Sequence, residues 1–193
     1  MRAYYQDKWV TIYHGDCREV LPQLDVKADL VLTDPDYKNQ DAAWFGMVRA
    51  SRVILTPGID NIALYPQPKW VLCWYKPSGI TYSRCGGFNQ WEPVLLYGDR
   101  FHFTQDYFYQ IPLNFSNGPE RHHIYPKPVN LWDWLILGGS KGHELILDPF
   151  LGSGTTCCCA KKLHRHSIGI EIEESYCEMA ARRCSQEVME LVA

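Results

Sequence analysis

The sequence contains no apolar run close to the roughly 20 residues that a membrane-spanning helix requires. Its N-terminus lacks the apolar core of a secretory signal peptide. Its eight cysteines include no C-x-x-C pair, which gives a zinc site little support, so the thiols are best interpreted as small buried side chains. Internal repeats and domain linkers are also missing. We therefore expect a cytoplasmic protein with no membrane partner and no metal, folded as a single domain over residues 1–193.

An excess of basic residues is missing as well, because the formal net charge is -3. Proteins that bind DNA mainly through its phosphates usually carry such an excess. Any basic contact surface must therefore be local. The candidates are residues 121–123 with Lys127, and residues 161–166, and each is equally well explained as a solvated face.

Short β-type runs alternate with helical segments, and this alternation predicts an α/β fold with a largely parallel sheet. Hydrophobic periodicity and turn residues give the expected boundaries. The predicted strands are 9–13, 29–33, 69–75, 92–97, 107–111, 144–147 and 167–170. The predicted helices are 40–53, 128–139, 155–163 and about 173–192.

The most specific segment is 145–183, which reads as strand, glycine loop, helix, strand, acid and helix. This order is typical of a nucleotide-binding βαβ unit. Glycines at 152 and 154 allow close approach of the backbone to a ligand, and the helix that starts at Thr155 points its first amides the same way. Glu171 ends the following strand, where an acid can accept hydrogen bonds from ribose hydroxyls.

The glycine loop excludes two common nucleotide sites. The G-x-G-x-x-G spacing of dinucleotide-binding proteins fails at Cys157, and no Gly-Lys-Ser/Thr follows as in a phosphate-binding loop. Asp148 favours a cationic ligand over a pyrophosphate. S-adenosylmethionine fits these requirements, because it has an adenosine, an ammonium and a sulfonium but no phosphate. A purely structural turn is the alternative.

A second segment, 13–37, ends in a strand that delivers Asp34-Pro35-Asp36-Tyr37. In open α/β sheets the loops at the carboxyl ends of strands line the ligand crevice. The Asp34 carboxylate and the Pro35 carbonyl are adjacent acceptors, and an exocyclic amino group needs two acceptors for its two protons. The ring of Tyr37 offers a flat face on which a base can stack.

These segments resemble the DNA methyltransferases that modify exocyclic amino nitrogens, adenine N6 or cytosine N4. The tetrad at 34–37 is similar to the family's D-P-P-Y catalytic motif, residues 148–156 match its cofactor loop, and 168–171 match the strand whose acid holds the ribose. Weaker likenesses are Gly15-Asp16 to a G-D element near the cofactor's adenine, 123–128 to H-P-x-x-K-P, and Trp91-Glu92-Pro93 to H-E-P.

The resemblance implies a Rossmann-like methyltransferase fold with a mostly parallel twisted sheet, helices on both faces and the circularly permuted motif order called the beta class. It implies a catalytic half at about 1–75, a short target-recognition-like region at about 76–125 and a cofactor half at about 126–193. The implied catalytic residues are Asp34, Pro35, Asp36 and Tyr37. The implied S-adenosylmethionine-binding residues are Asp16, Asp148, Phe150, Gly152, Ser153, Gly154, Thr155, Glu171 and, for the methionine end or the pocket rim, Lys127.

DNA is the implied partner, with the base flipped out of the duplex, as in restriction-modification systems. An acidic first residue, Asp34, is typical of adenine-N6 enzymes in this family. Asp36 departs from the motif, which has proline there, and the middle region is short. A catalytically inactive subunit that serves as a scaffold is therefore one alternative, and a cytosine-N4 or RNA methyltransferase is another. A homodimer or a separate recognition protein is a further expected partner.

Overall fold

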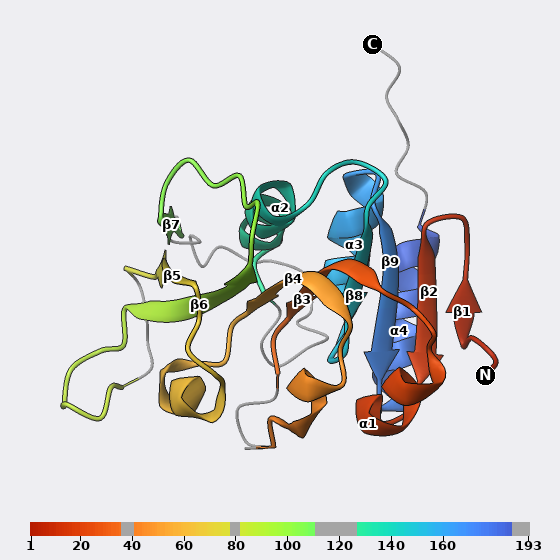
Figure 1. Ribbon diagram of the computed structural model, residues 1–193, viewed down its shortest axis with the longest axis horizontal. Coiled ribbons are helices and arrows are strands. Elements are labelled where there is room, and N and C mark those ends of the chain that lie inside the picture. Colours follow the sequence, from red (N-terminus) through yellow and green to blue (C-terminus); the bar gives the residue numbers. More distant parts are fainter. Residues whose placement is uncertain (36–40, 78–81, 111–126, 187–193) are drawn as a thin grey trace, which may run out of the picture.

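The computed structural model describes residues 1–35, 41–77, 82–110 and 127–186. These residues form one mixed sheet with the strand order β1-β2-β9-β8-β3-β4-β6-β5-β7 (Figure 1). The strands are β1 (Tyr5–Gln6), β2 (Val10–His14), β3 (Ala28–Thr33), β4 (Ala50–Leu55), β5 (Trp70–Tyr75), β6 (Trp91–Gly98), β7 (Tyr107–Tyr109), β8 (Leu145–Asp148) and β9 (His166–Glu171).

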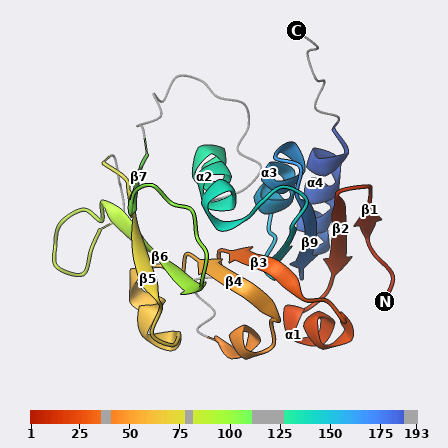
Figure 2. The ribbon, with the colours of Figure 1, turned by 45° about the horizontal axis from the view of Figure 1, so that its top comes forward.

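Helices cover both faces of this sheet. One face carries α2 (Val129–Gly139), α3 (Thr155–Lys162) and α4 (Glu174–Ser185), which stand side by side in Figure 2. The other face carries α1 (Cys17–Val20) and the short 3₁₀ helices η1 (Leu21–Gln23), η2 (Ala43–Gly46) and η3 (Ile59–Leu64). Within the described ranges, no helix has the length and apolar character needed to cross a membrane.

The centre of the sheet is parallel, as predicted. Strands β2, β9, β8, β3 and β4 run in the same direction, while β6 is antiparallel to β4 and β5. From β8 the chain moves to β9, and from β3 it moves to β4 on the opposite side. The boundary between β8 and β3 is therefore the topological switch point, where open α/β sheets bind their ligands.

Strand β3 shows how the sequence specifies this layering. Leu30 and Leu32 point to the cluster formed with α2, whereas Val31 points to the cluster formed with α1 and η2. All three are fully buried, because a central parallel strand is covered on both faces and reads as a continuous apolar run. The interpretation of cysteines as small buried thiols is confirmed for Cys17, Cys157, Cys159, Cys177 and Cys184.

The predicted helix at 40–53 is wrong. Within this range, Ala43–Gly46 forms the short 3₁₀ helix η2, and Ala50–Leu55 is strand β4, which lies between β3 and β6. Residue 40 lies outside the described residues. Val53, Ile54 and Leu55 are buried on a strand with both faces covered, and such a run lacks the alternation that separates strand from helix. Met47, which lies between η2 and β4, is 40% exposed.

The other predicted elements lie within a few residues of the observed ones. The predicted helix at 128–139 is α2, with Pro128 at its N-cap. The last predicted helix is α4, which the structure describes as far as Ser185, and residues 187–193 lie outside the described part. The short strand β1 was not predicted, since it has only two residues, Tyr5 and Gln6.

Candidate active site

The carboxyl ends of four parallel strands bring the predicted acids to one edge of the sheet. Asp16 follows β2, Glu171 ends β9, Asp148 ends β8 and Asp34 follows β3. The strands are neighbours in the order β2-β9-β8-β3, so these acids straddle the switch point. Strands β3 and β8 pair in parallel, so the segments that lead to Asp34 and Asp148 lie side by side.

A pocket opens beside β2 and β9 at this edge. Its walls combine aromatic and apolar side chains with acids, and the rings of Trp44 and Phe150 meet edge to face with centroids 5.2 Å apart. The lining residues are Gly15, Asp16, Cys17, Arg18, Asp41, Trp44, Pro149, Phe150, Ile170, Glu171 and Ile172. Three residues predicted to bind the cofactor, Asp16, Phe150 and Glu171, line this pocket, together with Trp44 and Asp41, which were not predicted.

Glu171, which lines the pocket, is fixed by two backbone donors. Its Oε2 accepts the amide of Gly152 at 2.7 Å, and its Oε1 accepts the amide of Glu173 at 2.9 Å. Glu171 is only 8% exposed. A carboxylate has about four acceptor positions, so this arrangement orients the group while leaving acceptor capacity toward the pocket.

Asp148 points into the protein instead of lining the pocket. Its carboxylate accepts hydrogen bonds from the Thr33 hydroxyl at 2.7 Å, the Thr156 hydroxyl at 2.5 Å and the Phe150 amide at 3.0 Å. The residue is 2% exposed. The expected direct contact with a cationic ligand is therefore corrected: Asp148 ties the loop after β8 to β3 and α3 from behind.

Burial raises the pKa of Asp148 to about 6 from the ordinary value of 3.8, although its hydrogen bonds oppose this change. We predict that this group stabilises the fold increasingly as pH falls from 7 towards 4, because the folded chain then holds a proton that the unfolded chain releases. The stabilisation is lost as pH rises through 6, and a change of this size is worth on the order of 3 kcal/mol.

Urea unfolding of the wild type and of Asp148→Asn between pH 4.5 and 7.5 measures this effect. We expect the stability of the wild type, relative to the asparagine variant, to increase as the pH is lowered. Parallel curves for the two proteins would show that Asp148 does not carry the proton.

The glycine loop is held between α3 and α4. Arg183 donates to the Ser153 carbonyl at 2.6 Å and to its hydroxyl at 3.0 Å, and Arg183 also reaches the Thr155 hydroxyl at 3.5 Å. Gly154 has φ +87°, and a Cβ there would lie 2.7 Å from that of Ala180. Gly154 therefore allows the close packing of α3 against α4, and its predicted part in ligand approach stays a prediction. Gly152 has φ +55° and donates to the pocket's carboxylate.

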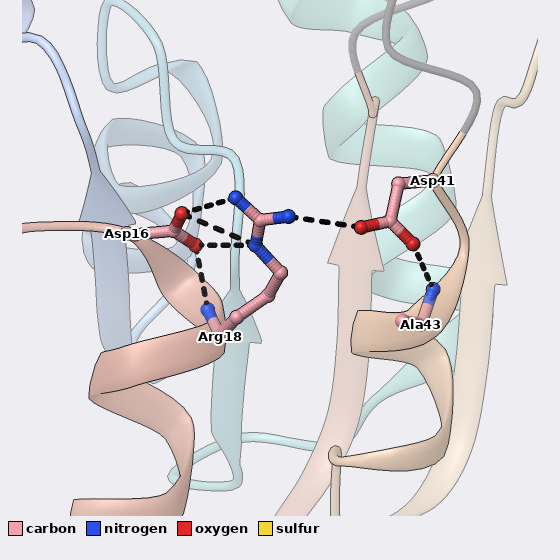
Figure 3. Close-up of polar contacts among 4 residues, drawn as sticks. All are labelled: Asp16, Arg18, Asp41 and Ala43. Carbon is pink, nitrogen blue, oxygen red and sulfur yellow. Dashed lines mark hydrogen bonds and ion pairs between the residues drawn. The ribbon is translucent and has the colours of Figure 1, made fainter.

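Arg18, which lines the pocket, links Asp16 to Asp41 (Figure 3). Its guanidinium binds Asp16, with Nη2 and Oδ2 2.5 Å apart, and reaches Asp41 Oδ2 at 2.9 Å. Asp16 also caps α1 by accepting the amide of Arg18, and Asp41 accepts the amide of Ala43. Hydrogen bonds from Arg18 lower the pKa of Asp16. The Asp16 carboxylate, predicted to lie near a cofactor adenine, is thus engaged by Arg18.

Asp34 is held by two partners on the other side of the switch point. Its Oδ1 accepts the Thr56 hydroxyl at 2.6 Å, and its Oδ2 pairs with the Lys127 ammonium at 2.8 Å. Lys127 is therefore the ion-pair partner of Asp34, the predicted catalytic acid. Thr56, which follows β4, was missed because that segment was assigned to a helix. Asp36 and Tyr37 of the predicted tetrad lie outside the described residues.

Beyond Lys127 the site is bounded by Trp74 on β5. The Lys127 ammonium lies 5.5 Å from the centroid of the Trp74 ring, and the indole nitrogen donates to Gln110 at 2.9 Å. A second ammonium, of Lys76, lies 4.8 Å from the same centroid and pairs with Glu92 at 2.8 Å. Glu92 belongs to the W-E-P stretch noted in the sequence and is buried.

The basic cluster at 161–166 is used inside the fold. Lys161 pairs with Asp7 at 2.5 Å, Lys162 pairs with Asp133 at 2.7 Å, and buried Arg165 donates to the carbonyl of Ser140. These contacts favour a structural role for the cluster. The other candidate, residues 121–123, lies outside the described part of the chain.

A sequence model of the family described as DNA methylase, covering N6 and N4 enzymes, matches residues 99–182. The chain is 30% identical over 143 residues to the type II methyltransferase M.HpaI of Haemophilus parainfluenzae, covering 61% of this chain and 45% of that protein. It is 45% identical over 65 residues to M2.DpnII of Streptococcus pneumoniae, covering 34% of this chain and 24% of that one. The chain thus spans less than half the length of these curated relatives.

Solved structures share the fold over nearly the whole chain. The M1.HpyAVI–SAM complex superposes with a TM-score of 0.74 at 24% identity, covering 91% of this chain and 99% of that one. The PvuII DNA methyltransferase, described as cytosine-N4-specific, superposes with a TM-score of 0.72 at 17% identity, covering 94% and 88%. The fold is therefore the Rossmann-like fold of S-adenosylmethionine-dependent methyltransferases. In sequence, the chain is similar to DNA amino-methyltransferases, and the family model covers residues 99–182.

Proposed function

We propose that the chain binds S-adenosylmethionine and methylates an exocyclic amino nitrogen of a flipped DNA base, preferentially N6 of adenine. The observation that carries this proposal is the position of Asp34. It lies at the end of β3, next to β8, whose own end leads into the cofactor loop of the family. An acceptor for an amino group and a pocket for the methyl donor thus flank one switch point.

The pocket suits the cofactor chemically. The described residues that line it supply three carboxylates and one guanidinium, so an adenosine with a cationic tail is favoured over a phosphorylated nucleotide. Glu171 would accept the ribose hydroxyls, and the rings of Phe150 and Trp44 would contact the adenine. When bound, S-adenosylmethionine supplies a methyl group activated by a sulfonium.

The catalytic work of the chain is then to present the acceptor nitrogen. The Asp34 carboxylate and the Pro35 carbonyl accept the two amino protons, which directs the nitrogen lone pair away from them and towards the methyl donor. The hydrogen bond from Thr56 fixes the Asp34 carboxylate. As the nitrogen–carbon bond forms, the nitrogen becomes positively charged and acidic. The Asp34 carboxylate stabilises this charge and then accepts the proton that the nitrogen loses.

The preference for adenine rests on the family's association of an acidic first motif residue with N6 enzymes. We expect the unmodified chain, given unmethylated DNA and S-adenosylmethionine labelled in the methyl group, to yield N6-methyldeoxyadenosine on nucleoside mass spectrometry. If the product were N4-methyldeoxycytidine, the proposed target base would be wrong, but the proposed class of DNA amino-methyltransferase would stand. Transfer of the label to RNA but not to DNA would show that the proposed substrate, DNA, is wrong. Cofactor binding without transfer to any nucleic acid would favour the scaffold alternative.

Cofactor binding gives an independent prediction. Glu171→Ala removes the acceptor for the ribose and the anchor of the Gly152 amide, so we expect affinity for S-adenosylmethionine to fall about 10- to 100-fold, as for hydrogen bonds to a charged group. Isothermal titration calorimetry measures the change. Glu174→Ala, an exposed acid at the start of α4, is the matched control and should change the affinity less than twofold. Equal affinities for both variants would move the ribose site elsewhere.

A further inference from the structure

The proposed function does not account for the ion pair between Asp34 and Lys127. Lys127 Nζ lies 2.8 Å from Asp34 Oδ2, and the two side chains are 14% and 24% exposed. Thr56 holds the other oxygen of Asp34, so the carboxylate cannot rotate freely. Lys127 stands just before Pro128, the N-cap of α2, and that helix is buried against the sheet. The fold therefore fixes the Asp34 carboxylate and the backbone from which the Lys127 side chain extends.

This pair places a hydrogen-bond donor directly beside an acceptor. Adenine carries the complementary edge, because its 6-amino group is a donor and the adjacent ring N1 is an acceptor. Cytosine has the same arrangement in its 4-amino group and N3. Thymine and guanine present a carbonyl acceptor beside a ring N–H donor, which would meet Asp34 and Lys127 with both polarities reversed. Flipped bases are read through hydrogen bonds to this edge.

We propose that Lys127 is a specificity-determining residue that donates to the ring nitrogen adjacent to the amino group held by Asp34. The inference rests on the proposed function and deepens it. On binding, the amino group of the base takes the place of the ammonium at Asp34 Oδ2, and the ammonium moves to the neighbouring ring nitrogen. The Trp74 ring, 5.5 Å from the ammonium and fixed by Gln110, keeps the charge in a favourable environment during this shift.

The proposal distinguishes Lys127 from a residue that only anchors the cofactor or only orients Asp34. A cofactor anchor would lower the affinity for S-adenosylmethionine when removed. A residue that only orients Asp34 would slow transfer to every base alike. If Lys127 donates to the ring nitrogen, removing Lys127 and removing the ring nitrogen abolish the same hydrogen bond. The two losses of activity should then not add when both groups are removed.

The test combines Lys127→Met with a target base that lacks this acceptor. The modified base is located by sequencing DNA methylated by the wild type, and oligonucleotides carry either adenine or 1-deazaadenine there. In the wild type we expect 1-deazaadenine to lower kcat/KM about 10- to 100-fold. In Lys127→Met we expect a comparable loss with adenine and no further loss beyond twofold with 1-deazaadenine. Affinity for S-adenosylmethionine should stay within twofold.

Two further variants protect the interpretation. Lys127→Arg keeps a donor and should retain part of the sensitivity to the ring nitrogen. Lys76→Met removes the other ammonium beside Trp74 and should retain all of it. Full additivity of the two losses in Lys127→Met, full activity of the wild type on 1-deazaadenine, or a loss of cofactor affinity would each overturn the proposal. If the wild type methylates only cytosine, 3-deazacytosine replaces 1-deazaadenine. Absence of transfer by the wild type would contradict the proposed function itself.

Discussion

Asp34→Ala is expected to lower kcat for methyl transfer by about 10³-fold or more while changing the affinity for S-adenosylmethionine less than twofold. Interactions with charge that develops only in the transition state are lost from kcat, and removing one such group typically costs about 10² to 10³. Here the same residue also orients the nitrogen, which adds to the loss. Asp34 does not line the pocket proposed to hold the cofactor, so binding of the methyl donor should be preserved.

Single-turnover transfer of labelled methyl groups and calorimetric cofactor binding measure the two quantities. Removing Asp34 also leaves the half-buried ammonium of Lys127 without that partner, which lowers stability, so thermal unfolding must accompany the assay. Asp34→Asn is a second variant that keeps the size and one acceptor. Asp25→Ala, a fully exposed acid near the end of η1, is the matched control. Undiminished transfer by Asp34→Ala would remove this residue from the mechanism.

The sequence was most informative where chemistry and periodicity coincide. The segments at 29–33 and 144–147 are short apolar runs that end in Asp-Pro, and they are the adjacent parallel strands β3 and β8. A buried strand that ends in an acid has few other ways to place that acid than at the sheet's carboxyl edge. The prediction of a helix at 40–53 was wrong because β4 is covered on both faces. A continuous apolar run does not show whether its side chains repeat with the period of a strand or of a helix.

Side-chain partners in the site were less predictable than its position. Asp148 was expected to face the ligand, but Thr33 and Thr156 on separate elements are better placed to satisfy a buried carboxylate. Arg18 engages Asp16 from two residues away, and Lys127 reaches Asp34 only because α2 returns to the end of β3. The Asp34–Lys127 pair depends on how the elements pack and cannot be inferred from sequence separation, whereas the Asp16–Arg18 pair is a local contact.

Gly154 shows the same dependence on packing and leads to the second prediction with a large effect. It lies between the cofactor loop and α3 with φ +87°, where L side chains are strained. A Cβ at this position would approach the Cβ of Ala180 to 2.7 Å and its Cα to 2.9 Å. The second contact is with backbone of α4, which cannot turn aside as a flexible side chain would. The close crossing of α3 and α4 thus requires glycine at 154.

We expect Gly154→Ala to lower the free energy of unfolding by about 2 to 6 kcal/mol, combining about 1 to 3 for the strained conformation with about 1 to 3 for the overpacked contact. Urea unfolding measures the change. Gly86→Ala is the matched control: its φ is +90°, but no atom lies within 4 Å of the added Cβ, so it isolates the conformational contribution. Adding Ala180→Gly to Gly154→Ala should recover part of the packing cost, although glycine within α4 itself costs about 1 kcal/mol. Equal losses at 154 and 86 would show that α4 moves away without resistance, and the requirement for glycine would then be conformational alone.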